Sequence, residues 1–350
     1  MFGMTWWQIL LFPIAILYNL ITSLRNHLYS IGNKTSIKFE TNVISVGNLA
    51  VGGTGKSPMI DFLIQHFLNK HKKIASLSRG YGRKTRGYRK AGILDSANTI
   101  GDEPMAFFLK FGDRLTVAVA EQRAIAIPFI LADQNDIEVI LLDDAFQHRA
   151  VAPSFSILLS TVDRPFYNDY LMPSGRLREA RKGVSRADVI CFTKAPKELS
   201  PSERAFIIEN TRSYNEQAPI FFSYIAYGGL VRFGQNKVKD KIIGVAGLAD
   251  STLFKEYLML HFDLKGFYDF GDHHDYSMRE VKDIVLELMA NEAMLVTTEK
   301  DFVKLRIFDN LLIHSCFYLP IQMKFLEGEA EFLRLVDNSL GNYTGPTWDD

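Results

Sequence analysis

The chain has 350 residues, of which 47% are hydrophobic and 23% charged, an ordinary balance for a folded globular protein. At about 150 residues per domain, this length predicts two domains or one large one. Forty basic and forty acidic side chains cancel, so the composition gives no basic field of the kind that binds nucleic acid. The two cysteines, Cys191 and Cys316, form no C-x-x-C motif, which indicates a reducing compartment and argues against structural zinc.

The start of the chain is apolar, because residues 1–24 carry no charged side chain and Arg25 is the first one. A helix over this stretch would be about 36 Å long, enough to cross the core of a bilayer, although Pro13 would kink it. On a helical wheel an uncharged polar stripe runs along one side, formed by Thr5, Gln8, Asn19, Thr22, Ser23, Asn26 and Ser30. This pattern favours a helix that lies on or in a membrane with the stripe against protein or headgroups. A buried soluble helix is the alternative, and a signal peptide is less favoured because a basic start and an A-x-A site are missing.

The next stretch, Val43–Pro58, runs from an apolar strand through a glycine-rich loop to Lys-Ser and a helix, the order of a P-loop. In a P-loop the lysine, here Lys56, reaches the β- and γ-phosphates, and the hydroxyl, here of Ser57, holds Mg²⁺. The strict pattern has glycine where Ala50 stands, but the glycines that follow leave the backbone free to approach phosphates. The residues predicted to bind ATP are Ala50, Val51, Gly52, Gly53, Thr54, Gly55, Lys56 and Ser57. A glycine-rich turn without a ligand is the alternative.

The second predicted strand ends in the polar sequence Ser78–Lys84, SRGYGRK. A strand–helix–strand unit of this length predicts a parallel pair joined by a right-handed crossover. Because ligands bind at the carboxyl ends of parallel strands, the side chains at this tip are expected beside the phosphate site. They are Arg79, Tyr81 and Arg83.

A later apolar strand, Glu138–Asp144, closes in two carboxylates, the Walker-B arrangement that holds Mg²⁺ directly or through water. Consecutive residues of a strand point to opposite faces, so one of Asp143 and Asp144 is expected to face the metal, and the choice stays open. Gln147 and His148 follow closely enough to line the same cleft.

Two other segments carry candidate side chains. Gly101–Pro104, GDEP, opens a predicted helix, in which Glu103 is interpreted as an ordinary first-turn acid, and Asp102 either does the same or acts as a base. Met172–Lys182 is a basic loop with one carboxylate, Glu179. This loop is either a solvated helix start or a lid that contacts phosphates.

The pattern changes at Pro219–Lys241, whose short alternating apolar runs predict a two-stranded connector. A second α/β unit is expected from Ile242, with Met294–Lys304 as a strand that ends in a charged loop. Within it, the DHH sequence Asp272–His274 has three interpretations: a metal site, an ordinary turn, or an imidazole paired with a carboxylate of the first domain. An imidazole beside a carboxylate is suited to removing a proton from a hydroxyl group.

Taken together, these elements predict an α/β fold with a P-loop NTPase core and a mainly parallel sheet. The expected divisions are a membrane-associated helix over 1–30, the P-loop core over 31–218, the connector over 219–241, and a smaller C-terminal α/β domain over 242–340.

Two other classes of P-loop protein share some of these features. A GTPase is not favoured, because no glycine stands in the required place after Asp144 and Thr193–Pro196 lacks the guanine-binding aspartate. A membrane-targeted switch ATPase that acts on a protein partner is the second hypothesis. It would share the glycine-rich loop and the amphipathic helix, but it would need no base for an acceptor hydroxyl.

The motifs together resemble the tetraacyldisaccharide 4′-kinase family, in the family's order and from the N-terminal helix to about residue 305. The segments that carry the resemblance are Val46–Pro58, Ser78–Arg83, Gly101–Pro104, Asp143–His148, Leu177–Glu179, Asp272–His273 and Thr298–Asp301. The chain departs from the family pattern at four places: Ser57 replaces the commoner threonine, Ala145 a glycine, Ala180 a proline, and Gly271 a proline.

The resemblance implies an ATP- and Mg²⁺-dependent kinase that phosphorylates the 4′-hydroxyl of a tetraacylated disaccharide 1-phosphate in lipid A synthesis. It implies a location at the inner membrane of a Gram-negative bacterium, with the catalytic face in the cytosol. By the same resemblance Asp102 and His273 are the catalytic pair, and Glu179 assists the metal beside Ser57, Asp143 and Asp144. Substrate contacts are implied for Arg79, Tyr81 and Arg123.

Overall fold

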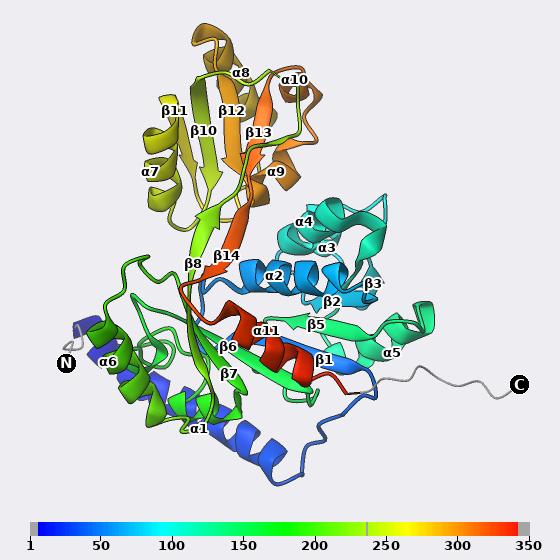
Figure 1. Ribbon diagram of the computed structural model, residues 1–350, viewed down its shortest axis with the longest axis vertical. Coiled ribbons are helices and arrows are strands. Elements are labelled where there is room, and N and C mark those ends of the chain that lie inside the picture. The colour runs from blue at the N-terminus through cyan, green and yellow to red at the C-terminus, as the bar shows by residue number, and fades with distance from the viewer. Residues whose placement is uncertain (1–5, 236, 342–350) are drawn as a thin grey trace, which may run out of the picture.

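The computed structural model describes residues 6–235 and 237–341. They form two parts, each built around one sheet, that lie one above the other along the long axis of the molecule (Figure 1). The larger sheet has nine strands, in the order β14 (Ile321–Phe325), β8 (Ile220–Tyr227), β7 (Val189–Thr193), β6 (Phe155–Thr161), β1 (Asn42–Asn48), β5 (Val139–Asp143), β2 (Ile74–Ser78), β4 (Thr116–Val119) and β3 (Arg89–Lys90). Strands β8 to β4 run parallel, and only the edge strands β14 and β3 are antiparallel to their neighbours. The predicted α/β class with a mainly parallel sheet is confirmed.

The central strands β1, β5 and β6 are buried along their whole length because helices cover both faces of the larger sheet. On β5, Val139 and Leu141 pack in the same core cluster as α2 (Lys56–Asn69) and α11 (Glu329–Asn338). The alternate residues of β5, Ile140 and Leu142, pack with α5 (Arg123–Asp133) on the other face. This part also contains α3 (Ala97–Ile100), α4 (Asp102–Phe111) and α6 (Pro201–Arg212).

The smaller sheet has the order β11 (Asp263–Phe270), β10 (Lys241–Gly247), β12 (Met294–Thr298), β13 (Cys316–Leu319) and β9 (Val231–Arg232). It packs with α7 (Thr252–His261), α8 (Met278–Ala290), α9 (Glu299–Leu305) and α10 (Asp309–Leu312). The stretch 219–241, predicted to be a two-stranded connector, contains β8 and β9. These two strands do not pair with each other: β8 pairs with β14, and β9 pairs with β13. The two extended segments that run between the sheets are therefore β8 and β14 (Figure 1).

The two parts of the chain also meet through helices α4 and α9. Lys110 of α4 lies 2.8 Å from a carboxylate oxygen of Asp61 in α2 and 3.2 Å from one of Glu299 in α9. Burial raises the pKa of both carboxyl groups, and the Lys110 ammonium opposes that shift. The charged segment that begins at Glu299 was predicted to be a loop, and this was wrong: the Thr298 side chain accepts a hydrogen bond from the Asp301 N–H and so caps a helix.

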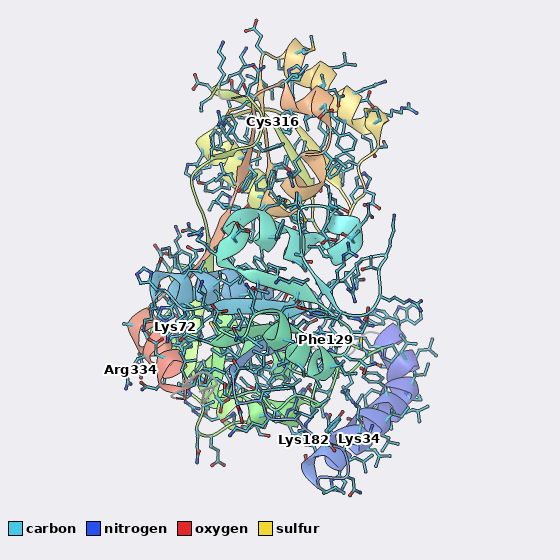
Figure 2. The ribbon with its side chains drawn as sticks, turned by 90° about the vertical axis from the view of Figure 1, so that its right-hand side faces the viewer. Lys34, Lys72, Phe129, Lys182, Cys316 and Arg334 are labelled. Carbon is cyan, nitrogen blue, oxygen red and sulfur yellow. The ribbon has the colours of Figure 1, made fainter. Side chains whose placement is uncertain are left out.

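Helix α1 (Trp6–Ser30) lies on the larger part of the protein, at the end far from the smaller sheet (Figures 1 and 2). Ala15 is its one buried residue, whereas Leu10, Leu17 and Leu20 are 70%, 58% and 61% exposed. The helix is long and apolar enough to cross a membrane by length and composition. Of the predicted polar stripe, the side chains of Asn26 and Ser30 make hydrogen bonds with the body of the protein. The backbone carbonyl of Gln8 accepts one from the Ser174 hydroxyl, and Thr5 lies outside the described residues.

Candidate active site

The glycine-rich loop between β1 and α2 has the backbone that a phosphate-binding loop requires. Gly52 and Gly55 have φ values of 108° and 80°, a region that side-chain-bearing residues rarely adopt. Thr54 fixes the turn: its hydroxyl accepts a 2.6 Å hydrogen bond from the Asn48 amide, and its carbonyl accepts one from the Thr193 hydroxyl. Lys56 is the first residue of α2, so the loop presents the helix N-terminus, where backbone N–H groups and the helix dipole favour an anion.

Asp144 is held beside this loop by two cations. Its carboxylate lies 3.8 Å from the Lys56 ammonium and forms a two-pronged pair with the Arg178 guanidinium, at 2.6 and 2.9 Å. The backbone at Asp144 has φ 50°, a left-handed conformation that turns the chain sharply after β5. Arg178, joined by Lys56, holds the pKa of the Asp144 carboxyl below its usual value despite burial.

Asp143 occupies a different environment at the end of β5. The side chain is buried, and its Oδ1 atom has no hydrogen-bond partner. Burial, with the charge of Asp144, raises the pKa of this carboxyl to about 7. A buried carboxylate oxygen without a partner fits a magnesium ion, which takes one or two protein oxygens and completes its shell with phosphate and water. The hydroxyl of Ser57, in the first turn of α2, is the other oxygen that would hold the ion.

Asp102 and His273 meet across the junction of the two parts, although 171 positions separate them in the sequence. The Nδ1 atom of His273 lies 2.9 Å from Oδ2 of Asp102, the first residue of α4. The Lys304 ammonium of α9 lies 3.1 Å from the same oxygen, and the ring of Tyr81 lies 5.2 Å from the His273 ring. Of the three interpretations of the DHH sequence, this geometry favours the imidazole–carboxylate pair.

Close backbone contacts hold Tyr81 and Asp102 in place. A side chain on Gly80 would lie 2.5 Å from the Ile100 carbonyl oxygen, and one on Gly101 would lie 2.9 Å from the Tyr81 carbonyl oxygen. Since both positions also have positive φ, glycine is required twice where the SRGYG and GDEP segments touch. The tip of β2 is thereby fixed against the start of α4. The carboxylate of the next residue, Glu103, is close enough to contribute to the raised pKa of Asp143.

The other residues predicted to contact the substrate differ in exposure. Arg79 and Tyr81 are exposed. Arg123 is only 2% exposed, and its guanidinium donates to the carbonyls of Ala120 and Glu121. Burial lowers the pKa of Arg123 to about 10, and the charges of the Walker-B pair partly offset that shift. Arg123 therefore lies within electrostatic range of the Walker-B carboxylates, with its side chain enclosed by protein.

Gln147 and His148 follow the Walker-B pair in a tight turn. The Gln147 amide donates to the carbonyl of Asn48 at 2.8 Å and to Glu179 at 3.0 Å. Burial and the nearby Arg123 charge lower the pKa of His148 to about 4, so its imidazole is neutral at neutral pH.

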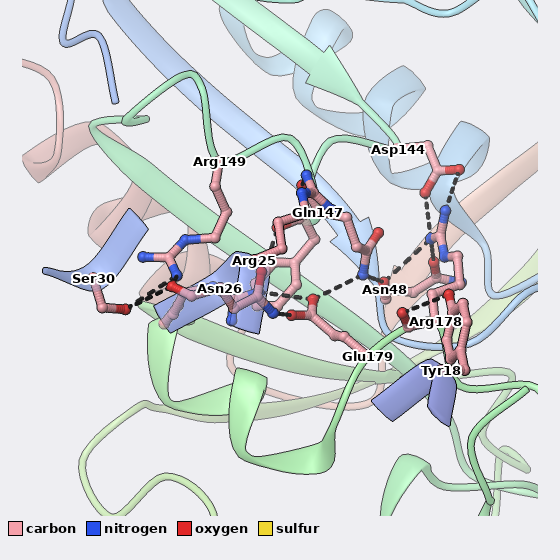
Figure 3. Close-up of polar contacts among 12 residues, drawn as sticks. Tyr18, Arg25, Asn26, Ser30, Asn48, Asp144, Gln147, Arg149, Arg178 and Glu179 are labelled. Atoms are coloured by element: carbon pink, nitrogen blue, oxygen red, sulfur yellow. Dashed lines mark hydrogen bonds and ion pairs between the residues drawn. The ribbon is translucent and has the colours of Figure 1, made fainter. Parts of the chain in front are cut away.

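Glu179 lies next to Arg178 in the chain, but its carboxylate points to another set of partners. The side chain is 2% exposed, and it accepts hydrogen bonds from Asn26 of α1 and from Gln147 (Figure 3). It also accepts one from Arg186. Both of its oxygens are engaged by protein donors. The metal role predicted for Glu179 stays a prediction.

Two side chains of the site were not identified from the sequence. Arg178 stands in the basic loop, and its partner Asp144 lies 34 positions away in the sequence. The sequence pattern assigns no role to Lys304. Its spacing of four from Lys300 would place both ammonium groups on one helix face, which was a usable signal once α9 is recognised as a helix. Lys300 contacts Asp272 at 2.6 Å and Nε2 of His273 at 3.3 Å.

Comparison with known proteins identifies the same family as the motifs. A family model described as tetraacyldisaccharide-1-P 4′-kinase matches residues 7–341. A tetraacyldisaccharide 4′-kinase of Flavobacterium psychrophilum is 41% identical over 342 residues, covering 95% of this chain and 97% of that protein. One of Flavobacterium johnsoniae is 41% identical over 331 residues, covering 92% and 94%.

A solved structure agrees with the sequence relatives. The "apo" form of LpxK from Aquifex aeolicus in complex with ATP superposes with a TM-score of 0.75 at 28% identity, covering 95% of this chain and 99% of that one. With the family model and the two relatives extending over nearly the whole chain, this protein belongs to the tetraacyldisaccharide 4′-kinase family.

Proposed function

We propose that this protein transfers the γ-phosphoryl group of ATP to the 4′-hydroxyl of an acylated disaccharide 1-phosphate, a step of lipid A synthesis. Family membership supports the reaction class, and the site supplies the parts that phosphoryl transfer requires. The observation that carries the proposal is the 2.9 Å contact of His273 with Asp102, since a P-loop switch needs no base for an alcohol.

The loop and Lys56 would bind and orient the triphosphate. The N–H groups of Ala50 to Ser57 surround the phosphates, and the Lys56 ammonium neutralises charge on the β- and γ-oxygens. Ser57 and the Asp143/Asp144 pair would hold Mg²⁺, which when bound would supply charge neutralisation on the phosphates. Arg178 keeps Asp144 oriented toward Lys56.

Asp102 would accept the proton of the sugar hydroxyl at its carboxylate. His273 and Lys304 both contact Oδ2 of Asp102, so they orient the group and leave Oδ1 for the acceptor. His273 would orient Asp102 or share its proton through Nδ1, while its other nitrogen lies 3.3 Å from the Lys300 ammonium, which is a donor. Arg79 and Tyr81 are exposed at the same edge and would contact the substrate, with Arg123 acting through its charge from within the protein. His273 and Lys304 come from the C-terminal part, so the site depends on contact between the two parts of the chain.

The test is ATP turnover with and without a 1-phosphorylated acyl-disaccharide in detergent micelles. Turnover that depends on the acceptor is expected. Strong ATP hydrolysis without an acceptor, unchanged when the acceptor is added, would favour the switch ATPase.

We propose that α1 binds this kinase to the inner membrane, with the catalytic part in the cytosol. The apolar side of α1 is exposed, while Asn26 and Ser30 on its polar side bond to the body of the protein. An apolar face left in water next to a docked polar face is suited to insertion among lipids.

Replacing Leu10 and Leu17 together by glutamate should release the protein from liposomes, because both side chains are more than half exposed on α1. Burying one leucine side chain contributes about 1.5–3 kcal/mol to the free energy of transfer from water. The double substitution should therefore lower the membrane partition coefficient at least about a hundredfold. Sedimentation with liposomes measures it, and Leu253→Glu, at a leucine of α7 that is 66% exposed, is the matched control. Unchanged sedimentation of the double variant would place the membrane contact elsewhere.

A further inference from the structure

A partly buried polar contact joins the membrane-facing helix to the loop that carries Arg178. Asn26 in α1 donates its side-chain amide to Oε2 of Glu179 at 2.7 Å (Figure 3). The other oxygen of Glu179 accepts from Arg186 at 2.8 Å and from Gln147 at 3.0 Å. Because Glu179 is 2% exposed, each of these donors compensates a charge that has been removed from water.

A residue next to this contact in the chain bonds directly to residues of the phosphate site. Arg178, the neighbour of Glu179, forms the two-pronged pair with Asp144 and also bonds to Asn48, at the end of β1. The backbone carbonyl of Arg178 accepts a 2.9 Å hydrogen bond from the Tyr18 hydroxyl of α1.

A second connection runs through the turn after the Walker-B pair. Arg25 of α1 donates to the Gln147 carbonyl at 2.6 Å. Further along, the Arg149 guanidinium donates to the carbonyl of Asn26 at 2.6 Å and to the Ser30 hydroxyl at 3.1 Å. Helix α1 thus contacts both segments that position Asp144, from residues on the side of the helix opposite its exposed leucines.

We propose that Asn26 and Glu179 are a positioning pair. Through this pair, the way α1 packs on the protein fixes where Arg178 and Asp144 lie at the nucleotide site. The inference rests on the proposed kinase function and goes beyond it, since it gives Glu179 a role toward α1 in place of a role toward the metal. The two oxygens of Glu179 accept three protein hydrogen bonds, so three of the about four lone-pair sites of this carboxylate are already used by protein donors.

An exchange of charges tests the pair. Asn26→Asp alone sets a second carboxylate against the buried carboxylate of Glu179, and about a tenfold or greater rise in the KM for MgATP is expected. Glu179→Gln alone should stay within about fivefold of the original enzyme, because the amide oxygen still accepts and the Asn26 amide can flip to accept in turn. In the double variant the carboxylate and the amide exchange places, so the KM for MgATP should return to within about fivefold.

The control is His27→Asp, which adds the same charge one position along α1 at an exposed residue and should leave the KM for MgATP unchanged. Thermal unfolding of all four variants shows which of them are folded. If Glu179 holds the metal, Glu179→Gln will raise the Mg²⁺ requirement strongly and Asn26→Asp will not be rescued by the second change, and that result would overturn the proposal.

Equilibrium binding of a fluorescent ATP analogue separates this inference from the proposed function. Were the unchanged enzyme to show no acceptor-dependent turnover, the kinase function would fail, while the binding series would still report on the pair. A rescue of nucleotide binding by the double variant supports the positioning role, and loss of binding in both Glu179→Gln variants contradicts it.

Discussion

Replacement of Lys56 by alanine should lower kcat by at least about 10²–10³-fold while the fold stays intact. The ammonium is placed at the start of α2, beside the glycine-rich turn, where charge accumulates on the transferring phosphoryl group. Because Lys56 also lies 3.8 Å from Asp144, its loss removes part of what keeps that carboxylate ionised. Steady-state turnover with saturating acceptor and ATP measures the effect.

A control for this variant is available on the same helix. Lys70 caps the other end of α2, is about half exposed, and pairs with Asp337 far from the glycine-rich loop. Lys70→Ala should keep near-normal turnover. Near-normal turnover of Lys56→Ala would show that the loop does not hold the γ-phosphate.

Asp102→Asn should give the second large effect, a fall in kcat of about 10²–10⁴-fold with ATP affinity retained. The amide preserves the size of the side chain but cannot accept a proton from the sugar hydroxyl. Its position at the start of α4, against His273 and Lys304, places it outside the loop that binds the triphosphate. Measuring kcat separately from ATP binding therefore separates loss of the base from loss of the nucleotide.

Two further variants sharpen this result. Asp113→Asn, at an exposed acid just beyond the other end of α4, should leave kcat unchanged. His273→Ala should lower kcat without weakening ATP binding. The double variant Asp102→Asn with His273→Ala should have a kcat only slightly below that of Asp102→Asn, because the two side chains act as a unit. Additive losses, or a fall in ATP affinity, would assign Asp102 to another role.

The nucleotide loop could be predicted from the sequence because its requirements are local. The motif requires a strand, then glycines with positive φ, then Lys56 and Ser57, all within a short stretch of sequence. The structure has them in that order. The parallel order of the central sheet was predictable for a related reason, since apolar strands alternate with helices and crossovers have one hand.

Contacts between distant segments could not be predicted by the same means. Nothing in local spacing shows that Arg178 pairs with Asp144, or that Asn26 donates to Glu179 across 153 positions. The meeting of Asp102 and His273 was expected only through the family resemblance and as one of three interpretations of the DHH sequence. The start of α9 was misjudged because Glu, Lys and Asp are as common in a capped first turn as in a loop, and the Thr298 cap decides between them.

The position of the transferred phosphate is the most direct test of the central claim. The enzyme is incubated with γ-labelled ATP and an acyl-disaccharide that carries a phosphate at position 1, and the product is mapped by tandem mass spectrometry. A single labelled monoester on the 4′-oxygen is predicted, with the 1-phosphate unlabelled, and Asp102→Asn should abolish its formation. Label released only as inorganic phosphate, or found at another position of the sugar, would contradict the account.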